Sequence, residues 1–229
     1  MENQRFLNKL DRKIEGKALL DHPYYQAWKA GELTLDSLRV YAAQYYFFEA
    51  EFPRFLSAIH ANCPDRDVRQ NILDNLWDEE HGPENHRKLW LDFCAPLGLD
   101  ERSVEESDVF LSTQTLLDTY SVIANQGSFQ EGLAAMYAYE AQVPKVALEK
   151  IRGLRENYGI NDERSLKFFE IHSTLDEEHS EREARDLARS TESFQEPMVE
   201  SALVAALDAW WAFLDGVEAE RHSPMQVFG

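Results

Sequence analysis

The segment F-F-E-I-H-S-T-L-D-E-E-H-S-E (Phe168–Glu181) contains both the helical pattern and the polar residues on which the fold and the site depend. It has no proline or glycine, and its apolar residues recur at helical spacing, so it predicts an α-helix. His172, Asp176 and His179 are separated by four and then three residues, which places them on one face of that helix. If this face points inward, three buried polar groups need partners, and a metal ion is the usual one.

The rest of the 229-residue chain also has helical periodicity, with few glycines and prolines. The expected helices cover residues 3–16, 23–30, 35–60, 65–95 with a break, 101–125 in one or two pieces, 128–155, 162–189 and 194–220. No segment alternates in the manner of a strand, and there is no repeat or low-complexity linker. The prediction is an all-α bundle of seven to eight helices in a single domain that spans residues 1–229.

Capping residues mark several of the expected helix starts. Ser128 and Ser193 each precede a glutamate by three residues, which is the pattern of a capping box. Thr34 and Asn161 are further expected N-caps, because their side chains can accept hydrogen bonds from the free amides of a first turn. These signals support the boundaries given above.

The composition restricts the class of protein. Hydrophobic residues make up 44% of the chain, as in a globular protein, and the net charge of −19 disfavours nucleic acid and anionic membranes as partners. Two cysteines, Cys63 and Cys94, cannot build a disulfide framework, and the N-terminal stretch has no apolar signal-peptide core. No apolar run approaches the ~18 residues of a membrane span. We therefore expect a cytoplasmic protein without nucleic-acid or membrane partners.

A second segment places ionisable residues on its apolar stripe. Steps of three and four residues from Leu76 reach Glu79, Pro83, His86 and Trp90. Glu79 and His86 share the stripe, since seven residues fall only about 20° short of two full turns. Pro83 lacks the amide hydrogen that would bond the carbonyl of Glu79, so we expect a kink there.

A third segment has the same feature, because Glu140 lies among the apolar residues Leu133, Met136 and Ala147. The complete set of polar residues on apolar stripes is Glu79, His86, Glu140, His172, Asp176 and His179. Carboxylates can bridge two cations and imidazoles suit iron, so three of each favour a dinuclear iron or manganese site between facing helices. Zinc is less suitable, because structural zinc prefers four ligands and often cysteine.

Each of these six residues also has an ordinary structural explanation. A single histidine on an apolar stripe is usually a hydrogen-bonded core residue, and a single glutamate often lies at the edge of the core. Their combination on three helices favours a metal site. The other acidic residues of these segments are expected on solvated faces: Glu80, Glu84, Glu177, Glu178, Glu181 and Glu183.

A tyrosine and a lysine accompany Glu140. Tyr139 is its neighbour in sequence, and Lys150 follows Tyr139 by eleven residues, within ~20° on the helical wheel. A lysine beside a metal pocket can be an amine donor or a base if its pKa is lowered. A surface lysine that extends its apolar stem along the helix is the commoner arrangement, and spacing alone leaves both open.

Several motifs resemble a known family. The stretch H-P-Y-Y-Q-A-W-x-x-G-x-L-T-x-D-x-L-R-x-Y (His22–Tyr41) resembles the start of the TenA/PqqC-type heme-oxygenase-like proteins. The segments D-E-E-H-G-P-E-N-H, M-Y-A-Y-E-A-Q-V-P and H-S-T-L-D-E-E-H are similar to the metal-binding members of that superfamily. The similarity runs through essentially the whole chain. It is greatest to the dimetal oxygenases that form para-aminobenzoate for folate, the group of the chlamydial protein associating with death domains.

The resemblance implies a seven-helix heme-oxygenase-like fold without haem, in which the six stripe residues bind two metal ions, Fe/Fe or Fe/Mn. It also implies O₂ as co-substrate and an external reductant. Tyr25 matches the tyrosine that is sacrificed as the carbon source, and Lys150 matches the lysine that gives up its nitrogen. Tyr41 and Tyr139 match nearby redox tyrosines. Homodimers are common in the wider fold, so a homodimer is expected, whereas a death-domain interaction has no recognisable support in this sequence.

Two other functions remain open from the sequence. A dimetal oxidase of the same fold would act on an external small molecule, and a non-catalytic helical protein would store metal or bind a partner. Thiamin-degrading relatives use a cysteine nucleophile without metal, and PqqC-type relatives lack this dimetal set. The six filled metal positions therefore favour the self-sacrificing oxygenase.

Overall fold

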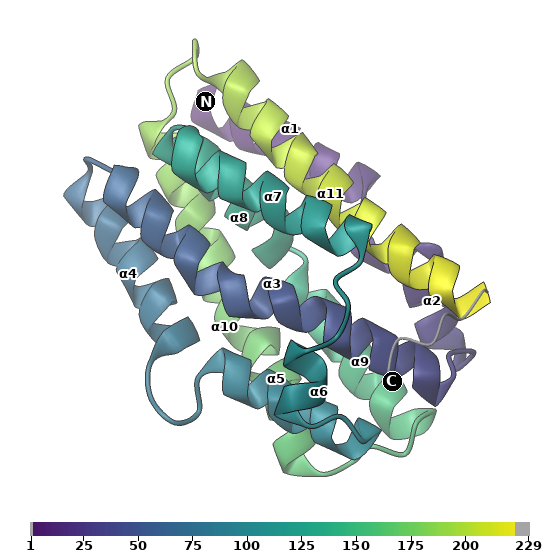
Figure 1. The fold of residues 1–229 in the computed structure, drawn as a ribbon. Coiled ribbons are helices and arrows are strands. Elements are labelled where there is room, and N and C mark those ends of the chain that lie inside the picture. Colours follow the sequence, from purple (N-terminus) through teal and green to yellow (C-terminus); the bar gives the residue numbers. More distant parts are fainter. Residues whose placement is uncertain (1, 223–229) are drawn as a thin grey trace.

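Helices α3 (Leu35–Asn62), α10 (Glu163–Ser190) and α11 (Glu196–His222) are the long elements of the structure, a computed structural model that describes residues 2–222. Figure 1 shows α3 crossing the bundle between α7 and α11 on one side and α4 and α5 on the other. Helix α10 packs against α9, α5 and α8, and α11 packs against α8 and α7. Helices α3 and α10 therefore both border the interior of the bundle.

The all-α prediction is confirmed, because residues 2–222 contain helices and no strand. The other helices are α1 (Glu2–Gly16), α2 (Pro23–Ala30), α4 (Arg66–Glu80), α5 (His86–Cys94), α6 (Glu101–Glu105), α7 (Leu111–Gln126), α8 (Phe129–Glu140) and α9 (Val143–Glu156). Short 3₁₀ turns at Leu19–Asp21 and Ala95–Leu97 join some of them. There are more helices than the seven to eight predicted, because three predicted segments are each divided into two.

Prolines explain two of these divisions. Instead of the kink expected at Pro83, α4 ends at Glu80 and a loop with Gly82 at φ +84° leads to α5. In the predicted helix 128–155, Pro144 lies in the first turn of α9, where a missing amide hydrogen is tolerated. In both places the chain starts a new helix rather than continuing through a residue that cannot bond the preceding turn.

The predicted caps are confirmed in part. Ser128 forms the expected capping box, and the Thr34 side chain accepts a hydrogen bond from the amide of Ser37. The N-cap of α10 is Asp162 rather than Asn161. The box predicted at Ser193 is wrong, because α11 begins only at Glu196, so that glutamate occupies the first helical position instead of the third.

Helix α11 belongs to the core. By length and hydropathy alone this helix would also pass as a membrane span. However, half of its most apolar 18-residue stretch is buried in the protein, and the core helix of a soluble protein passes the same test. Trp210 and Phe213 are buried, and the indole Nε1 of Trp211 donates to the carbonyl of Lys17 at 2.8 Å. Trp210 and Phe213 are therefore core residues.

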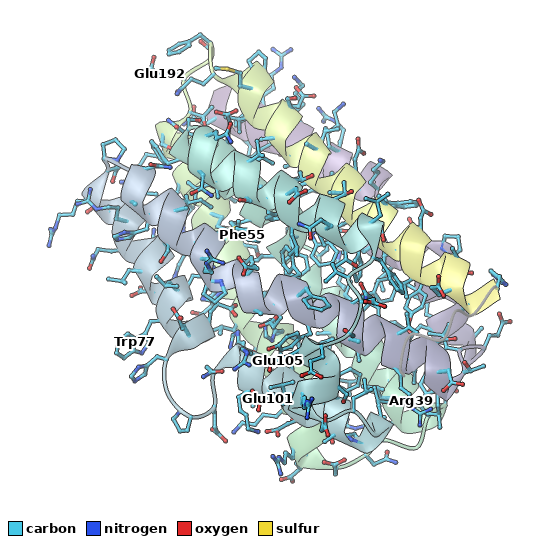
Figure 2. All side chains as sticks on the ribbon, viewed as in Figure 1. Arg39, Phe55, Trp77, Glu101, Glu105 and Glu192 are labelled. Carbon is cyan, nitrogen blue, oxygen red and sulfur yellow. The ribbon has the colours of Figure 1, made fainter. Side chains whose placement is uncertain are left out.

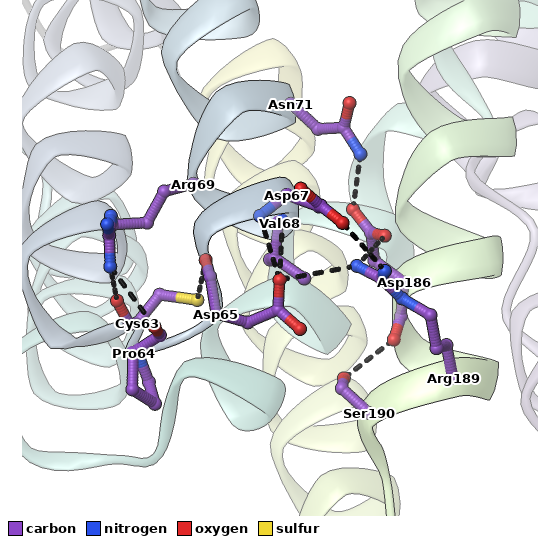
Figure 3. A network of polar contacts seen from close by, with 10 residues as sticks. All are labelled: Cys63, Pro64, Asp65, Asp67, Val68, Arg69, Asn71, Asp186, Arg189 and Ser190. Carbon is purple, nitrogen blue, oxygen red and sulfur yellow. Dashed lines mark hydrogen bonds and ion pairs between the residues drawn. The ribbon is translucent and has the colours of Figure 1, made fainter.

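A polar network ties the C-terminal part of α10 to the start of α4 (Figure 3). The Asn71 side chain donates to Asp186 Oδ2 at 2.7 Å, and Arg189 lies 3.5 Å from Asp65, the N-cap of α4. Asp186 itself is 5% exposed, so its bond to Asn71 is shielded from water. This contact fixes the register of α10 against α4, and with it the positions of the polar residues further along both helices.

Candidate metal centre

Helix α10 presents four buried polar side chains on one face. His172, Asp176 and His179 are 4%, 2% and 3% exposed, so the face identified from the sequence points inward. Glu183 is buried as well, and its assignment to a solvated face was wrong. It follows His179 by four residues and thus continues the same stripe. The remaining glutamates of that group are exposed, as predicted.

The other predicted ligands lie on helices that face α10. Glu79 on α4, His86 on α5 and Glu140 on α8 are all buried. The orientation of α4 is visible in Figure 2, where Trp77 projects to solvent at the outer side of the bundle, while Glu79 is directed to the interior. The structure thus brings all six predicted residues into the core between α4, α5, α8 and α10.

Four donor atoms meet at one point of this interior. One ligand atom each from Glu49, Glu79, His86 and His172 lies within 4.8 Å of all the others, and the four side chains are buried. Glu49, on α3, was not predicted. A sequence signal for it exists, because Tyr41, Tyr45 and Glu49 follow one another in steps of four. It was hidden because this part of α3 is buried on most sides and shows no single apolar stripe.

The imidazoles are oriented by contacts outside the cluster. His172 Nδ1 lies 2.7 Å from the carbonyl oxygen of Phe168, which leaves Nε2 free. His179 Nε2 lies 3.3 Å from Asp78 Oδ2, which leaves Nδ1 without a hydrogen-bond partner and 3.9 Å from Asp176 Oδ1. Such bonds to one ring nitrogen are the usual way in which proteins direct the other toward a metal ion.

Glu140, Asp176, His179 and Glu183 form a second group next to the first. Asn75 donates to Glu140 Oε1 at 2.9 Å. Each member of the second group has one buried polar atom without a partner. Buried polar atoms are nearly always paired, so four unpaired atoms in this one group indicate a missing partner.

Electrostatics support a cationic partner. Burial raises the pKa of Asp176 well above its usual range, and it raises the pKa of Glu140 to about 8. Burial, assisted by Glu140, likewise raises the pKa of Glu183 well above its usual range. Burial lowers the pKa of His172 to about 3, so its ring is neutral and able to bind a metal.

Within the first group, charge is partly compensated. Burial opposes the protonation of His86, but the carboxylate of Glu79 outweighs it and raises the pKa of the imidazole to about 9. His86 Nδ1 lies 2.7 Å from Glu79 Oε2, at the distance of an ion pair. One ligand atom of each residue also belongs to the group of four that lie within 4.8 Å of one another, so both residues are placed to bind one ion.

The donor set suits two divalent ions. Oxygen and imidazole donors without a thiolate are typical of iron and manganese sites. The cluster contains five carboxylates, namely Glu49, Glu79, Glu140, Asp176 and Glu183. With two divalent ions, five ionised carboxylates would leave a net charge of −1, and the three predicted carboxylates alone would leave +1. Either net charge is far less costly to bury than the carboxylates without metal.

The predicted tyrosines and lysine form a separate buried assembly next to the candidate metal ligands. The hydroxyl of Tyr25 lies 3.0 Å from that of Tyr41, and Lys150 Nζ donates to Tyr41 at 2.6 Å. Lys150 is only 4% exposed, so the alternative of a surface lysine is wrong. Burial, opposed by the charge of Glu49, lowers its pKa to about 7, and the amine can therefore be neutral near neutral pH.

Tyr45 completes this assembly and was not predicted. Its hydroxyl is hydrogen-bonded to that of Tyr139, whose ring stacks on Trp210 at a centroid distance of 4.6 Å. Lys150 Nζ lies 4.9 Å above the ring of Tyr45 and 4.9 Å above that of Tyr41. Tyr45 thus stands between the predicted pair of Tyr41 and Tyr139.

A small cavity lies between the tyrosines and the candidate ligand His172. It is lined by Tyr25, Tyr45, Tyr139, Lys150 and His172, together with apolar residues. The volume that the centre of a water-sized molecule can occupy in this cavity is about 10 Å³. This is room for a single water or O₂ molecule.

Comparison with known proteins gives consistent matches. Residues 39–212 match the model of a family described as iron-containing redox enzymes. The 4-aminobenzoate synthase of Nitrosomonas europaea is 39% identical over 95% of this chain and 92% of its own length. The 4-aminobenzoate synthase of Chlamydia pneumoniae is 36% identical over 90% and 91%. A CADD-like protein of unknown function from Nostoc punctiforme shares the fold, with a TM-score of 0.79 at 17% identity and full coverage of both chains.

Proposed function

Because this chain belongs to the family of iron-containing redox enzymes and is an oxidoreductase, we propose that it forms 4-aminobenzoate (para-aminobenzoate) from two of its own side chains. Similarity to 4-aminobenzoate synthases over nearly the whole chain supports this product. Tyr25 would supply the carbon atoms and Lys150 the nitrogen. Each chain would then react once.

The metal ions of this proposal are Fe/Fe or Fe/Mn, held by the six predicted ligands Glu79, His86, Glu140, His172, Asp176 and His179. When bound, the ions supply the activation of O₂, with electrons from an external reductant. The protein contributes the positions of the donors and a cavity next to them that excludes bulk water.

The observation that carries the proposal is the position of the Lys150 amine. It is hydrogen-bonded to Tyr41, which in turn contacts the Tyr25 hydroxyl, and it lies 5.7 Å from the centre of the Tyr25 ring. Tyr41 therefore holds the nitrogen donor and the phenol together. A buried amine with a pKa of about 7 has a substantial neutral fraction at neutral pH, and only the neutral amine is nucleophilic.

The chemistry assigns a task to each group. The ring and Cβ of Tyr25 contain all the carbon atoms of 4-aminobenzoate. Its formation requires cleavage of the Cα–Cβ bond, oxidation of Cβ to the carboxyl group and exchange of the phenol oxygen for the Lys150 nitrogen. We propose that Tyr41 or Tyr139 relays an electron between Tyr25 and the metal centre, and the contact of Tyr45 with Tyr139 supports the second route.

The size of the cavity favours the protein's own residues over an external substrate. The cavity beside Lys150 has room for one water-sized molecule and is too small for an aromatic acid. An external phenol would have to displace Tyr25, which is 3% exposed and fills this position already.

The direct test is a single-turnover reaction. Protein loaded anaerobically with Fe(II), with and without Mn(II), is exposed to O₂ and a reductant, and the protein and small-molecule fractions are analysed by mass spectrometry. We expect at most one 4-aminobenzoate per chain and a matching loss of mass at Tyr25 and Lys150. Intact side chains with product that depends on an added substrate would instead identify an oxidase of external molecules. Metal uptake without O₂ consumption would identify a storage protein.

The burial of Lys150 predicts a pH-dependent cost in stability. Its pKa is about 7 in the folded protein against ~10.4 when unfolded, so the unfolded state binds more protons between these values. The stability contributed by this group therefore falls as the pH drops from ~10.4 to about 7, by roughly 5 kcal/mol, and is constant below. Relative to wild type, Lys150→Met should be most stabilising at and below pH 7.

Denaturant unfolding of both proteins across this pH range measures the difference. Lys145→Met, which removes an exposed lysine of the same helix, controls for the loss of a positive charge. A stability difference between wild type and Lys150→Met that does not change with pH would contradict the assignment of a buried, neutral amine.

A further inference from the structure

We propose that Glu49 is a seventh ligand of the metal centre and binds the same ion as Glu79, His86 and His172. This inference rests on the proposed function, since it requires that the centre binds metal. It changes the composition of the centre, because the ion at this position would have two carboxylates and two imidazoles. The ion at the neighbouring position would have Glu140, Asp176 and His179.

The first argument is the unpaired carboxylate. Glu49 is 4% exposed, and its Oε1 atom has no hydrogen-bond partner. The amine of Lys150, the nearby lysine, donates its hydrogen bond to Tyr41 and not to Glu49. The neighbouring group that acts most strongly on Glu49 is a second carboxylate, Glu79. Two adjacent buried carboxylates are strongly destabilising unless a cation is present. The side chain therefore has the environment of a ligand rather than of a structural glutamate.

The second argument is distance. Two donors on opposite sides of one ion, with bonds of ~2.1 Å, are about 4.2 Å apart. The ligand atoms of Glu49, Glu79, His86 and His172 all lie within 4.8 Å of one another, so small side-chain shifts would bring them to a single ion. Glu49 meets this criterion together with three of the predicted ligands.

The third argument is a local sequence pattern that Glu49 shares with two predicted ligands. Pro53, Pro83 and Pro144 each follow a glutamate by four residues. These glutamates are Glu49, Glu79 and Glu140. A proline at this position lacks the amide hydrogen that would bond the glutamate's carbonyl in a continuous helix. The helix ends at or just after Glu79 and Glu140, whereas α3 continues through Pro53.

The proline four residues after the glutamate is thus common to three glutamates that converge on one interior, and it suggests a common role for all three. The missing hydrogen bond allows the backbone to adjust at the point where each carboxylate enters the core. Glu183, the other additional carboxylate, lacks this pattern, because the residue four positions later is Leu187. The pattern thus groups Glu49 with the glutamates already assigned as ligands.

The test compares Glu49→Gln with Glu51→Gln. Glu51 lies two residues further along α3, is partly exposed and pairs with Arg54 at 2.7 Å, so its substitution controls for loss of a negative charge on this helix. Both variants and wild type are loaded anaerobically with Fe(II), and bound iron per chain is measured by elemental analysis after equilibrium dialysis over a range of iron concentrations.

We expect wild type and Glu51→Gln to bind two ions, and Glu49→Gln to bind one of them at least about tenfold more weakly. The melting temperature adds a second readout, because the substitution should raise it without metal and should reduce its increase on iron loading. Without metal, Glu49→Gln should melt above wild type, because it removes the repulsion between the buried carboxylates of Glu49 and Glu79. Iron loading should raise the melting temperature of Glu49→Gln by less than it raises that of wild type.

Equal iron affinity in Glu49→Gln and wild type would overturn the inference while leaving the proposed function intact. A wild type that binds no iron would overturn both. If the glutamine variant folds poorly, as shown by a lower melting temperature in the absence of metal, Glu49→Asp retains the charge on a shorter side chain. Its iron affinity should also fall, and an affinity equal to that of wild type would contradict the proposal.

Discussion

Tyr25→Phe is expected to abolish 4-aminobenzoate formation, with a yield at least about 100-fold below wild type. Phenylalanine has no oxygen at the position that the lysine nitrogen must occupy, and its ring is not oxidised through loss of a phenolic proton. The hydrogen bond to Tyr41 is lost as well, at a cost to stability of about 1 kcal/mol. The variant should therefore fold and load metal, but produce nothing.

Tyr24→Phe is the matched control. Tyr24 precedes Tyr25 on α2, is equally buried, and its hydroxyl donates to the carbonyl of Ser37 at 3.3 Å, away from Lys150. Its yield should stay close to that of wild type. Protein produced with ring-deuterated tyrosine gives a second measurement, because the deuterium should appear in the product. Unlabelled product, or undiminished yield from Tyr25→Phe, would exclude Tyr25 as the carbon source.

Asp176→Asn is expected to remove about one metal ion per chain. Asp176 is 2% exposed, and its Oδ2 atom has no hydrogen-bond partner. Asparagine has nearly the same shape but lacks the negative charge, so the variant should fold while its affinity for one ion falls by at least about tenfold. Elemental analysis after anaerobic loading measures the ratio of metal to protein, and the O₂-dependent reaction should be lost with the ion.

Glu177→Gln provides the comparison for this variant. Glu177 is the next residue on α10 and is exposed, so its replacement removes the same charge from the solvated face. It should leave the metal content unchanged. Equal metal content in both variants would show that the inward face of α10 does not bind metal.

Helical periodicity accounts for what the sequence predicted of this site. His172, Asp176 and His179 were placed on an inward face because their spacing matches apolar neighbours on the same helix, and they are buried there. Glu183 extends the same spacing and was assigned to the solvated face in error. The spacing was sufficient to place Glu183 on the inward face, because it follows His179 by four residues.

Glu49 and Tyr45 show where periodicity gives no information. The part of α3 that contains them is buried on most sides, so apolar residues surround the helix and no stripe distinguishes an inward face. Lys150 is a different case, since the same spacing suits a lysine that extends to the surface and one that is enclosed. Packing of α9 against α10 and α2 encloses it.

The sequence by itself determined the all-α class, most helix starts and the inward direction of the six predicted ligands, because these depend on contacts within single helices. Only the tertiary structure decided that Glu49 joins Glu79, His86 and His172, and that Lys150 meets Tyr41 and Tyr25. The physical reason is that these groups come from different helices. Their meeting depends on how the helices pack, which local spacing does not specify.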